Sequence, residues 1–479
     1  MSRKRKQKRQ QPPMHVGPQL SRADKLVKEG MWLQMAGKHG PAMEHYIRAL
    51  ELTPGHAGAL FAAGLLSQHL GRKEEAAKCF KASLQSEPKN ADAWYNLGKM
   101  HHDLGRPDEA LPCYLAALEH DEYHAHALGN AGHCFMAKGD VKAARLCWDR
   151  LLARDPKSPE AIYNRSFVKL LHGDLEGGWA DYEARWNCPG YKLEYGRNDL
   201  HSVPLWTDQD LAYRVLYLHG EQGLGDQIQM LRFVSEIERR SPEHVIIEVL
   251  PALVPLVANT WPGYDVRERS GRADVTGVDF HLPMMSLPAR HGGRHPDRVP
   301  YLTAKPGAAP AEVREWIERE HIRGQRVLGL VWAGSSTHPG DWARSIPADE
   351  LAPLAEVPGV SWLSLQIGER ANDAPWFEVR RVHEHVTDFR TSAAIASLLD
   401  GVVTVDTSTA HLAGALALPT WTLLPPVPDY RWQLERLDTD LYPTMRLWRR
   451  GATESWRTVL ERVADELRAG GLARRTRSL

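Results

Sequence analysis

A 34-residue period is the feature that most constrains the fold of this chain. Two series of glycines, a series of alanines and a series of aromatic residues all recur at this interval. A period of this length is typical of helical repeats, in which no unit buries its apolar face alone and neighbouring units must stack. We therefore expect an α-solenoid. The four series are Gly30, Gly64, Gly98 and Gly132; Gly37, Gly71, Gly105 and Gly139; Ala42, Ala76, Ala110 and Ala144; and Tyr46, Phe80, Tyr114 and Trp148.

Each repeating unit is expected to form two antiparallel helices. The small residues let the helices approach closely, the aromatic residue fills the gap to the next pair, and the glycines serve the turn. The third unit of the pattern resembles the tetratricopeptide repeat, whose signature offsets are occupied by Trp94, Leu97, Gly98, Ala110 and Tyr114. This resemblance implies a groove that binds a protein or peptide.

The repeat array is expected to span residues 20–188, with four full units and a degenerate fifth. Gly173, Trp179 and Tyr182 mark the fifth unit, and the helix-breaking sequence at 187–190 is expected to cap the array and join it to the next domain. Residues 1–19 carry a cluster of arginines and lysines without an apolar core after it, which predicts a disordered basic tail.

Composition argues against several classes of partner. Sixty basic residues balance sixty acidic ones, so nucleic acid is not expected as a partner. No apolar stretch approaches the length of a membrane span. The five cysteines lack the paired spacing of metal sites, and Cys79, Cys113 and Cys147 follow the repeat period, so we interpret these three as small buried packing residues. A reducing cytoplasm is the expected location.

Residues 200–323 alternate between strand and helix patterns, which predicts a first α/β lobe. An apolar stretch at 214–218 precedes a flexible turn containing Gly223 and Gly225, and Asp226 stands at the start of the following helix. The glycines would let a ligand approach the backbone, although their spacing is not the dinucleotide-binding fingerprint. Two further strands are expected at 244–250 and 278–282.

Residues 324–479 repeat the alternation and predict a second α/β lobe. A strand at 326–332 runs into a loop of small residues that contains Ser335, and Arg344 follows just before the next helix. A strand at 362–366, a helix at 392–399 and a closing helix at 456–467 complete the pattern, apart from the unit described next.

The stretch at 401–424 predicts a strand, a tight loop, a helix and a second parallel strand. Open α/β sheets bind ligands at the carboxyl ends of their strands, and the N–H groups of a helix start suit a phosphate. The residues of this loop and helix start are Asp406, Thr407, Ser408, Thr409 and His411. An equally acceptable interpretation is that Asp406 and Thr407 only cap the helix. The loops that end in Asp226, Ser335 and Asp406 could face one cleft between the lobes.

Several motifs occur in order between about residues 160 and 460. They are GEQGLGDQIQ, LVWAGS followed by ARSIP, SLQ, DTSTAHLAGALALP, and PDYRW followed by YPTMRLW. Together they resemble the GT-B glycosyltransferases, most closely the bacterial heptosyltransferase family (glycosyltransferase family nine) and tetratricopeptide proteins with a similar catalytic region. The resemblance implies twin Rossmann-like lobes after the α-solenoid: an N-terminal lobe at 200–323 and a C-terminal, nucleotide-sugar-binding lobe at 324–479.

The resemblance also implies roles for individual residues. Asp226 matches the carboxylate proposed as general base for the acceptor hydroxyl, and Arg344 matches a lysine that contacts the donor phosphate. The amides of the helix start and Arg344 would stabilise the leaving phosphate, so no metal or other cofactor is expected. The full set expected to bind the donor is Gly223, Gly225, Ser335, Arg344, Gln366, Asp406, Thr407, Ser408, Thr409 and His411.

Some positions depart from the family pattern. Glu221 and Gln222 stand where heptosyltransferases have small hydroxyl residues, and Asp341 and Trp342 also differ, which leaves the sugar and the acceptor open. His411 could contact the donor or form a hydrogen bond within the helix start. For Asp429, Arg431 and Arg446, ion pairs and donor contacts are equally acceptable.

Two functions are consistent with these patterns. The first is an inverting, metal-independent glycosyltransferase that moves a hexosyl, heptosyl or N-acetylhexosaminyl group from a nucleotide-sugar to a protein or glycan acceptor selected by the repeats. The alternative is a non-catalytic tetratricopeptide scaffold whose GT-B module is inactive or senses a nucleotide.

Overall fold

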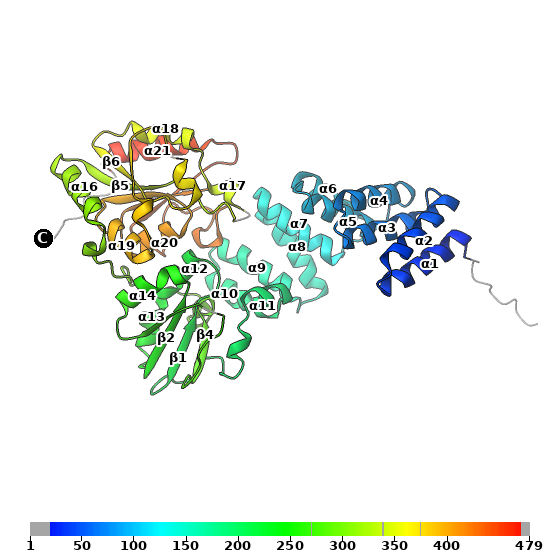
Figure 1. Cartoon of the computed structure of the whole chain (residues 1–479), viewed down its shortest axis with the longest axis horizontal. Helices are drawn as coiled ribbons and strands as arrows, with labels where there is room; N and C mark the ends of the chain where they lie inside the picture. Colours follow the sequence, from blue (N-terminus) through cyan, green and yellow to red (C-terminus); the bar gives the residue numbers. More distant parts are fainter. Residues whose placement is uncertain (1–19, 270, 338–339, 374, 471–479) are drawn as a thin grey trace, which may run out of the picture. The chain divides into compact units, whose positions relative to one another are not determined.

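The computed structural model describes residues 20–269, 271–337, 340–373 and 375–470 (Figure 1). The described residues form two compact units, one up to residue 156 and the other from residue 157 onward. The expected basic tail, 1–19, lies outside the described residues. Every helix in the described ranges is too short or too polar to cross a bilayer.

The described part of the first unit consists of helices that pack in consecutive pairs. The side chains of His56, Asn90 and His124 accept a hydrogen bond from the first turn of α3, α5 and α7, and therefore define where these helices begin. The helices are α1 (Arg22–Met35), α2 (His39–Leu52), α3 (Ala57–His69), α4 (Lys73–Ser86), α5 (Ala91–Asp103), α6 (Pro107–His120), α7 (Ala125–Lys138) and α8 (Val141–Arg154).

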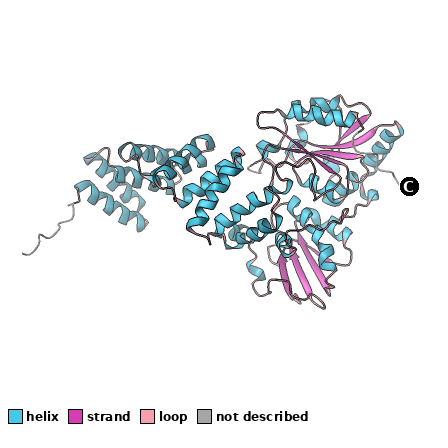
Figure 2. Cartoon of the chain, turned by 180° about the vertical axis from the view of Figure 1, so that it is seen from behind, coloured by secondary structure: helices cyan, strands magenta, loops and turns pink. Residues whose placement is uncertain are grey.

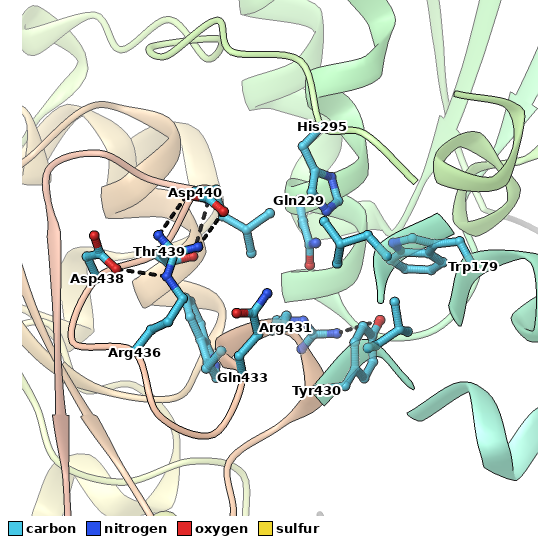
Figure 3. A pocket seen from close by; sticks show the side chains of 14 residues that line it. Trp179, Gln229, His295, Tyr430, Arg431, Gln433, Arg436, Asp438, Thr439 and Asp440 are labelled. Carbon is cyan, nitrogen blue, oxygen red and sulfur yellow. Dashed lines mark hydrogen bonds and ion pairs between the residues drawn. The ribbon is translucent and has the colours of Figure 1, made fainter. Parts of the chain in front are cut away.

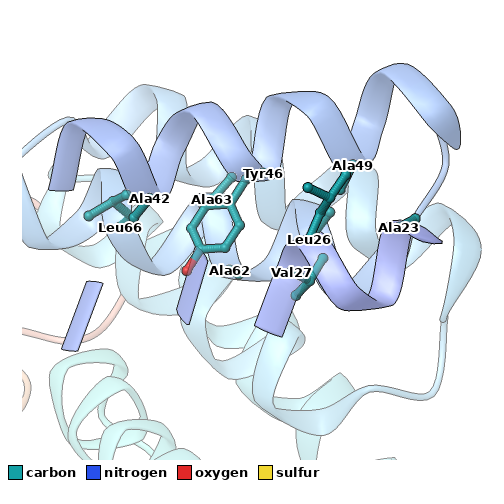
Figure 4. Close-up of a cluster of buried hydrophobic side chains, with 10 residues drawn as sticks. Ala23, Leu26, Val27, Ala42, Tyr46, Ala49, Ala62, Ala63 and Leu66 are labelled. Carbon is teal, nitrogen blue, oxygen red and sulfur yellow. The ribbon is translucent and has the colours of Figure 1, made fainter. Parts of the chain in front are cut away.

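The two glycine series have different roles. Gly37, Gly71, Gly105 and Gly139 adopt positive φ values of 73° to 85° in the turns, as expected. A Cβ atom on Gly30 would lie 2.5 Å from the ring of Tyr46. Each aromatic residue therefore also fills space within its own pair, which the sequence interpretation had assigned only to the gap between pairs. Figure 4 shows Tyr46 within a cluster that also contains Ala62 and Ala63 of α3.

The fifth helix pair, α9 (Pro159–Leu171) and α10 (Leu175–Tyr182), lies in the second unit. Gly173 forms its turn with a φ of 80°. A 3₁₀ helix, η1 (Glu183–Asn187), and the short helix α11 (Pro189–Tyr195) follow. Pro189 thus begins a helix, where its fixed φ is favourable, whereas the sequence interpretation made it a helix-breaking end.

The first lobe contains a parallel sheet with strand order β3-β2-β1-β4. The strands are β1 (Val215–His219), β2 (His244–Val249), β3 (Asp265–Glu268) and β4 (Phe280–Pro283). The helix expected after β1 is interrupted by a 3₁₀ turn, η3 (Leu231–Phe233), because α12 ends at Met230 and α13 begins at Val234. The helices are α12 (Leu224–Met230), α13 (Val234–Glu238), α14 (Val254–Thr260) and α15 (Leu287–Arg290).

The second lobe contains a parallel sheet with strand order β10-β9-β8-β5-β6-β7. Figure 2 shows the strands of both lobes in magenta and the helices around them in cyan. Its strands are β5 (Arg326–Val331), β6 (Val360–Ser364), β7 (Val379–Arg381), β8 (Gly401–Val405), β9 (Thr420–Leu424) and β10 (Met445–Arg449). Its helices are α16 (Ala311–Ile322), α17 (Asp341–Arg344), α18 (Ala352–Ala355), α19 (Phe389–Ala396), α20 (Ser408–Ala415) and α21 (Trp456–Arg468). In Figure 1, α18 and α21 cover one face of this sheet, and α19 and α20 cover the other.

The strand order of the second lobe reverses between β5 and β8, since β6 lies beside β5 on one side and β9 beside β8 on the other. Parallel sheets leave a crevice at such a point, outside the carboxyl ends of the strands. The second unit therefore has an α/β architecture, and its candidate site lies where the loops after β5 and β8 meet.

Candidate functional site

The first turns of α12 and α20 lie against each other. A Cβ atom on Gly225 would lie 2.9 Å from Cδ2 of His411 and 3.6 Å from Cα of Ser408. A larger side chain at this position would push the two helices apart. Gly225, which was predicted to let a ligand approach the backbone, permits close contact between the two lobes.

Both carboxylate oxygens of Asp226 have partners. Oδ2 accepts a hydrogen bond from the backbone N–H of Gly223 at 2.9 Å, which caps α12. Oδ1 accepts a hydrogen bond from the guanidinium of Arg431, which comes from the other lobe. The candidate base is therefore neutralised by a cation from the second lobe in this conformation.

Arg431, in the 3₁₀ helix η10 (Tyr430–Trp432), connects two carboxylates. Its Nε atom lies 3.4 Å from Oδ1 of Asp429. Burial raises the pKa of Asp429 to about 6, and the negative charges of Asp406 and Asp226 act in the same direction against the charge of Arg431. The sequence left ion pairs and donor contacts open for Asp429, Arg431 and Arg446. Asp429 and Arg431 form an ion pair with each other, and Arg446 forms one with Glu466 at 2.9 Å.

Arg344 and Asp406 come together at the crevice between β5 and β8. The Nη1 group of Arg344 donates to the backbone carbonyl of Asp406 at 2.9 Å, and its Nε lies 3.4 Å from Oδ1 of Asp341. Arg344 thus holds the loop after β8 from the end of α17. Ser335 lies exposed in the loop after β5, where its hydroxyl is 2.8 Å from that of Thr337.

Gln366 is buried and engaged with backbone groups. Its Oε1 accepts hydrogen bonds from the N–H groups of Trp332 at 3.1 Å and Ala333 at 2.9 Å, and its Nε2 donates to the carbonyl of Ala333 at 3.0 Å. In this arrangement Gln366 positions the loop after β5. Its side-chain oxygen is occupied by backbone N–H groups and is not directed at a nucleotide-sugar.

No side chain of the described residues caps the start of α20, although Thr407 occupies the N-cap position. In α19, by contrast, Asp388 accepts a hydrogen bond from the N–H of Thr391 at 2.8 Å. The interpretation that Asp406 and Thr407 cap this helix is therefore not supported by a side-chain hydrogen bond. An uncapped start leaves backbone N–H groups available to another acceptor, beside the half-buried Ser408 and Thr409.

His411 is buried behind this helix start. Its Nδ1 lies 2.9 Å from the hydroxyl of Tyr442, and its ring stacks on that of Trp432 with 5.2 Å between centroids. Burial lowers the pKa of His411 well below its usual value, and the charges of Arg431 and Arg232 add to this effect. The imidazole is therefore neutral and bonded to Tyr442 rather than to the helix start.

Two residues of the turn after β1 depart from the heptosyltransferase pattern, Glu221 and Gln222. They connect this turn to the helical segment before it. Glu221 is buried and accepts a hydrogen bond from Arg185, also fully buried, at 2.8 Å. Gln222 donates to the hydroxyls of Tyr182 at 2.6 Å and Tyr191 at 3.0 Å. These contacts attach α10, η1 and α11 to the first lobe.

A pocket that the sequence analysis missed lies beside this site, between the fifth helix pair, α12 and the segment at 430–441 (Figure 3). Its free volume is about 20 Å³, room for one or two water molecules. Trp179 could have been suspected because it occupies an aromatic position of the degenerate fifth unit, but no pattern marks Gln229, His295 or Gln433. Among the described residues, no group of three or more His, Cys, Asp or Glu side chains could hold a metal ion.

The repeats of the chain match known families. Residues 61–125 and 101–163 match two family models described as tetratricopeptide repeat. The chain thus carries tetratricopeptide repeats, and the prediction of such repeats is confirmed.

The chain is also similar to particular proteins. Protein FlbA of Caulobacter vibrioides is 24% identical over 64% of this chain, and the match spans about half of that protein (54%). Two similar solved structures are YrrB, a TPR protein with an unusual peptide-binding site (24% identity, 35% of this chain, 87% of that chain, TM-score 0.32), and a thermophilic TPR protein of Thermus thermophilus (19%, 36%, 93% and 0.28).

Proposed function

We propose that the second unit is a glycosyltransferase with a nucleotide-sugar donor, inverting and independent of metal, and that the repeats select its protein or glycan acceptor. The observation that carries this proposal is the uncapped start of α20, which lies at the switch point of a parallel sheet, beside Arg344 and across from Asp226.

The donor diphosphate would bind at the start of α20. Backbone N–H groups at a helix start and the positive end of the helix dipole favour an anion. Arg344 is already bonded to the carbonyl of Asp406 and lies at the same crevice, so its guanidinium can add charge-assisted hydrogen bonds. Negative charge that develops on the leaving phosphate would be stabilised by these groups.

The acceptor hydroxyl would lose its proton to Asp226. In the described conformation Oδ1 of Asp226 is paired with Arg431, so this pair must open before a hydroxyl can take its place. A bound diphosphate offers Arg431 another anionic partner, which would release Asp226 when the donor is present.

The same ion pair supports the second candidate, a non-catalytic scaffold whose GT-B module senses a nucleotide. If Arg431 never leaves Asp226, the module has a phosphate site and no free base. The two candidates therefore differ in chemistry rather than in donor binding.

Hydrolysis assays with a panel of nucleotide-sugars distinguish the glycosyltransferase from the non-catalytic scaffold. We expect slow hydrolysis of one donor by the wild-type protein, and a loss of about a hundredfold in Asp226→Asn, since a positioned base contributes about that much. The control is Asp465→Asn, because Asp465 is an exposed carboxylate of α21 that pairs with Arg468 and belongs neither to the site nor to the pocket beside it. Equal hydrolysis by Asp226→Asn and wild type would contradict the assigned base, and no hydrolysis of any donor would favour the scaffold.

A further inference from the structure

The outer face of α1, the first helix of the repeat array, is exposed where the same face of later repeats is buried. Trp32 is 72% exposed, whereas the residues one and two periods later, Leu66 and Met100, are 0% exposed. Leu66 packs in one cluster with Tyr46 and Ala49 of α2 (Figure 4). In a later repeat this position therefore receives the preceding helix pair. No described helix precedes α1, so Trp32 has no such pair to cover it.

Three charged residues share this face with Trp32. Lys25, Lys28 and Glu29 precede it at helical spacing, so the four side chains form one stripe along the helix, which we call the α1 stripe. All four are exposed, whereas the corresponding residues of α3 are buried: Ala59, Ala62, Ala63 and Leu66. Charged side chains keep the end of a solenoid soluble, and a tryptophan does not. An end cap thus accounts for the three charges, and Trp32 indicates a contact surface.

The charges of the α1 stripe are available to a partner. Within the described ranges, Lys25 and Lys28 form no ion pair. The carboxylate of Glu29 lies 3.6 Å from Nε2 of His45, and the Glu29 side chain is 63% exposed, so a second cation can reach it. The stripe therefore offers a partner two ammonium groups, one carboxylate and an indole ring.

The order of these residues along the helix is self-complementary. When a second α1 lies antiparallel with its Glu29 opposite Lys28, its Trp32 lies opposite Lys25. The first contact is an ion pair, and the second places an ammonium group over an indole ring. The two-fold axis repeats both contacts. A parallel arrangement would instead oppose each lysine to its own copy, and these like charges repel.

The other end of the repeat array is not available for stacking. Gln222 of the first lobe donates a hydrogen bond to the hydroxyl of Tyr182 in the fifth helix pair at 2.6 Å. The buried ion pair between Arg185 and Glu221, at 2.8 Å, attaches the segment that follows. Copies of the chain therefore cannot continue the array head to tail, whereas a contact between two α1 helices closes after two copies.

We propose that the chain forms a dimer through an antiparallel pair of α1 helices, in which Lys28 pairs with Glu29 and Lys25 packs over Trp32 across the two-fold axis. Met35, which is 81% exposed, extends the contact, and the alkyl stem of Arg22 lies opposite it in this register. Each copy contributes one helix, so the interface is small and the dissociation constant falls in the micromolar range. The dimer does not depend on the proposed reaction.

Sedimentation velocity of the full chain, from low micromolar to hundreds of micromolar concentration, tests this dimer. In Lys28→Glu, and separately in Glu29→Lys, like charges meet at both copies of the ion pair. An equimolar mixture of these two variants restores two opposite pairs, because each glutamate then faces a lysine. The matched control is Lys81→Glu, which reverses the charge of an exposed lysine on α4. Trp32→Ala removes the indole, and circular dichroism checks that every variant is folded.

We expect wild type and Lys81→Glu to dimerise, both single charge variants to remain monomeric, and their mixture to form a dimer again. Trp32→Ala should dimerise at least about tenfold more weakly, as expected for a tryptophan at the centre of an interface. A wild type that stays monomeric at every concentration would overturn the proposal and leave the α1 stripe to a different molecule. A dimer that persists in the single variants, or a mixture that stays monomeric, would overturn the assigned contact.

Discussion

At the scale of single residues, the site depends on one arginine shared by two aspartates. Arg431 bonds Oδ1 of Asp226 and lies 3.4 Å from Asp429. Asp406 adds a third negative charge nearby, which is one cause of the raised pKa of Asp429. At neutral pH Asp429 is thus a carboxylate, although burial and the neighbouring carboxylates favour its protonated form.

Replacement of Asp429 by Asn should therefore stabilise the protein at neutral pH. The folded-state pKa, about 6, lies above the ordinary value of 3.8, so the folded protein binds the extra proton between these values and wild-type stability falls as the pH rises through them. Above pH 6 the stability lost through the charged Asp429 side chain no longer changes with pH. Because the side chain is 36% exposed, we discount the shift and expect Asp429→Asn to gain about 1 kcal/mol at pH 7.5.

The measurement is urea unfolding of Asp429→Asn and wild type at pH 7.5 and pH 4. The gain should disappear at pH 4, where the wild-type group is protonated in the folded state. A loss of stability at pH 7.5 would mean that the ion pair with Arg431 outweighs the burial of the carboxylate.

At the scale of elements, the contact between α12 and α20 sets how closely the lobes approach. A Cβ atom on Gly225 would be 2.9 Å from the ring of His411, which is held by Tyr442 and Trp432 and has little freedom to move. We expect Gly225→Ala to reduce the free energy of unfolding by about 1–3 kcal/mol through overpacking. Gly190→Ala in α11, with nothing within 4 Å of the new Cβ, is the control and should be neutral. Similar urea midpoints for both variants would contradict the assigned contact.

The ion pair between Arg185 and Glu221 attaches the helical segment at 183–195 to the first lobe. Both side chains are buried, so removal of one partner leaves an unpaired charge. We expect Arg185→Met to cost about 3–5 kcal/mol, and the double variant Arg185→Met/Glu221→Leu to recover part of this loss. The half-buried Arg436, whose partners Asp438 and Asp440 are exposed, provides the control, since Arg436→Met should cost less than about 1 kcal/mol. Chemical denaturation followed by tryptophan fluorescence measures all variants, and a double variant less stable than Arg185→Met would contradict this account.

At the scale of the whole molecule, the sequence predicted the regular parts of the fold. The period of the glycines and aromatic residues predicted α1–α8, and the apolar runs predicted β1, β2, β4, β5, β6, β8 and β9, with bounds that differ by up to two residues at most ends. Strands β3 and β7 were missed because each has at most four residues and charged side chains such as Asp265 and Arg380, and β10 was recognised only as part of a motif.

The candidate site was predicted in outline but not in its pairings. Asp226 was expected at a helix start and Asp406 directly after a strand, and the structure places them there, in the first turn of α12 and next to the end of β8. Arg344 was expected just before a helix but is the last residue of the short helix α17. The pair between Asp226 and Arg431 joins residues that are 205 positions apart, so no local pattern could indicate it. The hydrogen bonds of Gln366 and the buried amide of Gln229 likewise depend on tertiary packing.

The central claim is that the start of α20 and Arg344 bind the diphosphate of a nucleotide-sugar. Thermal unfolding with UDP, GDP, ADP, CDP and dTDP tests it most directly. A ligand that binds only the folded state adds about 2.7 kcal/mol at a hundredfold excess over Kd. We expect one nucleotide to raise the Tm of wild type and of Arg446→Gln, which removes the ion pair of an exposed arginine with Glu466, and to have no effect on Arg344→Gln. No shift with any nucleotide at millimolar concentration, or an equal shift in Arg344→Gln, would contradict the claim.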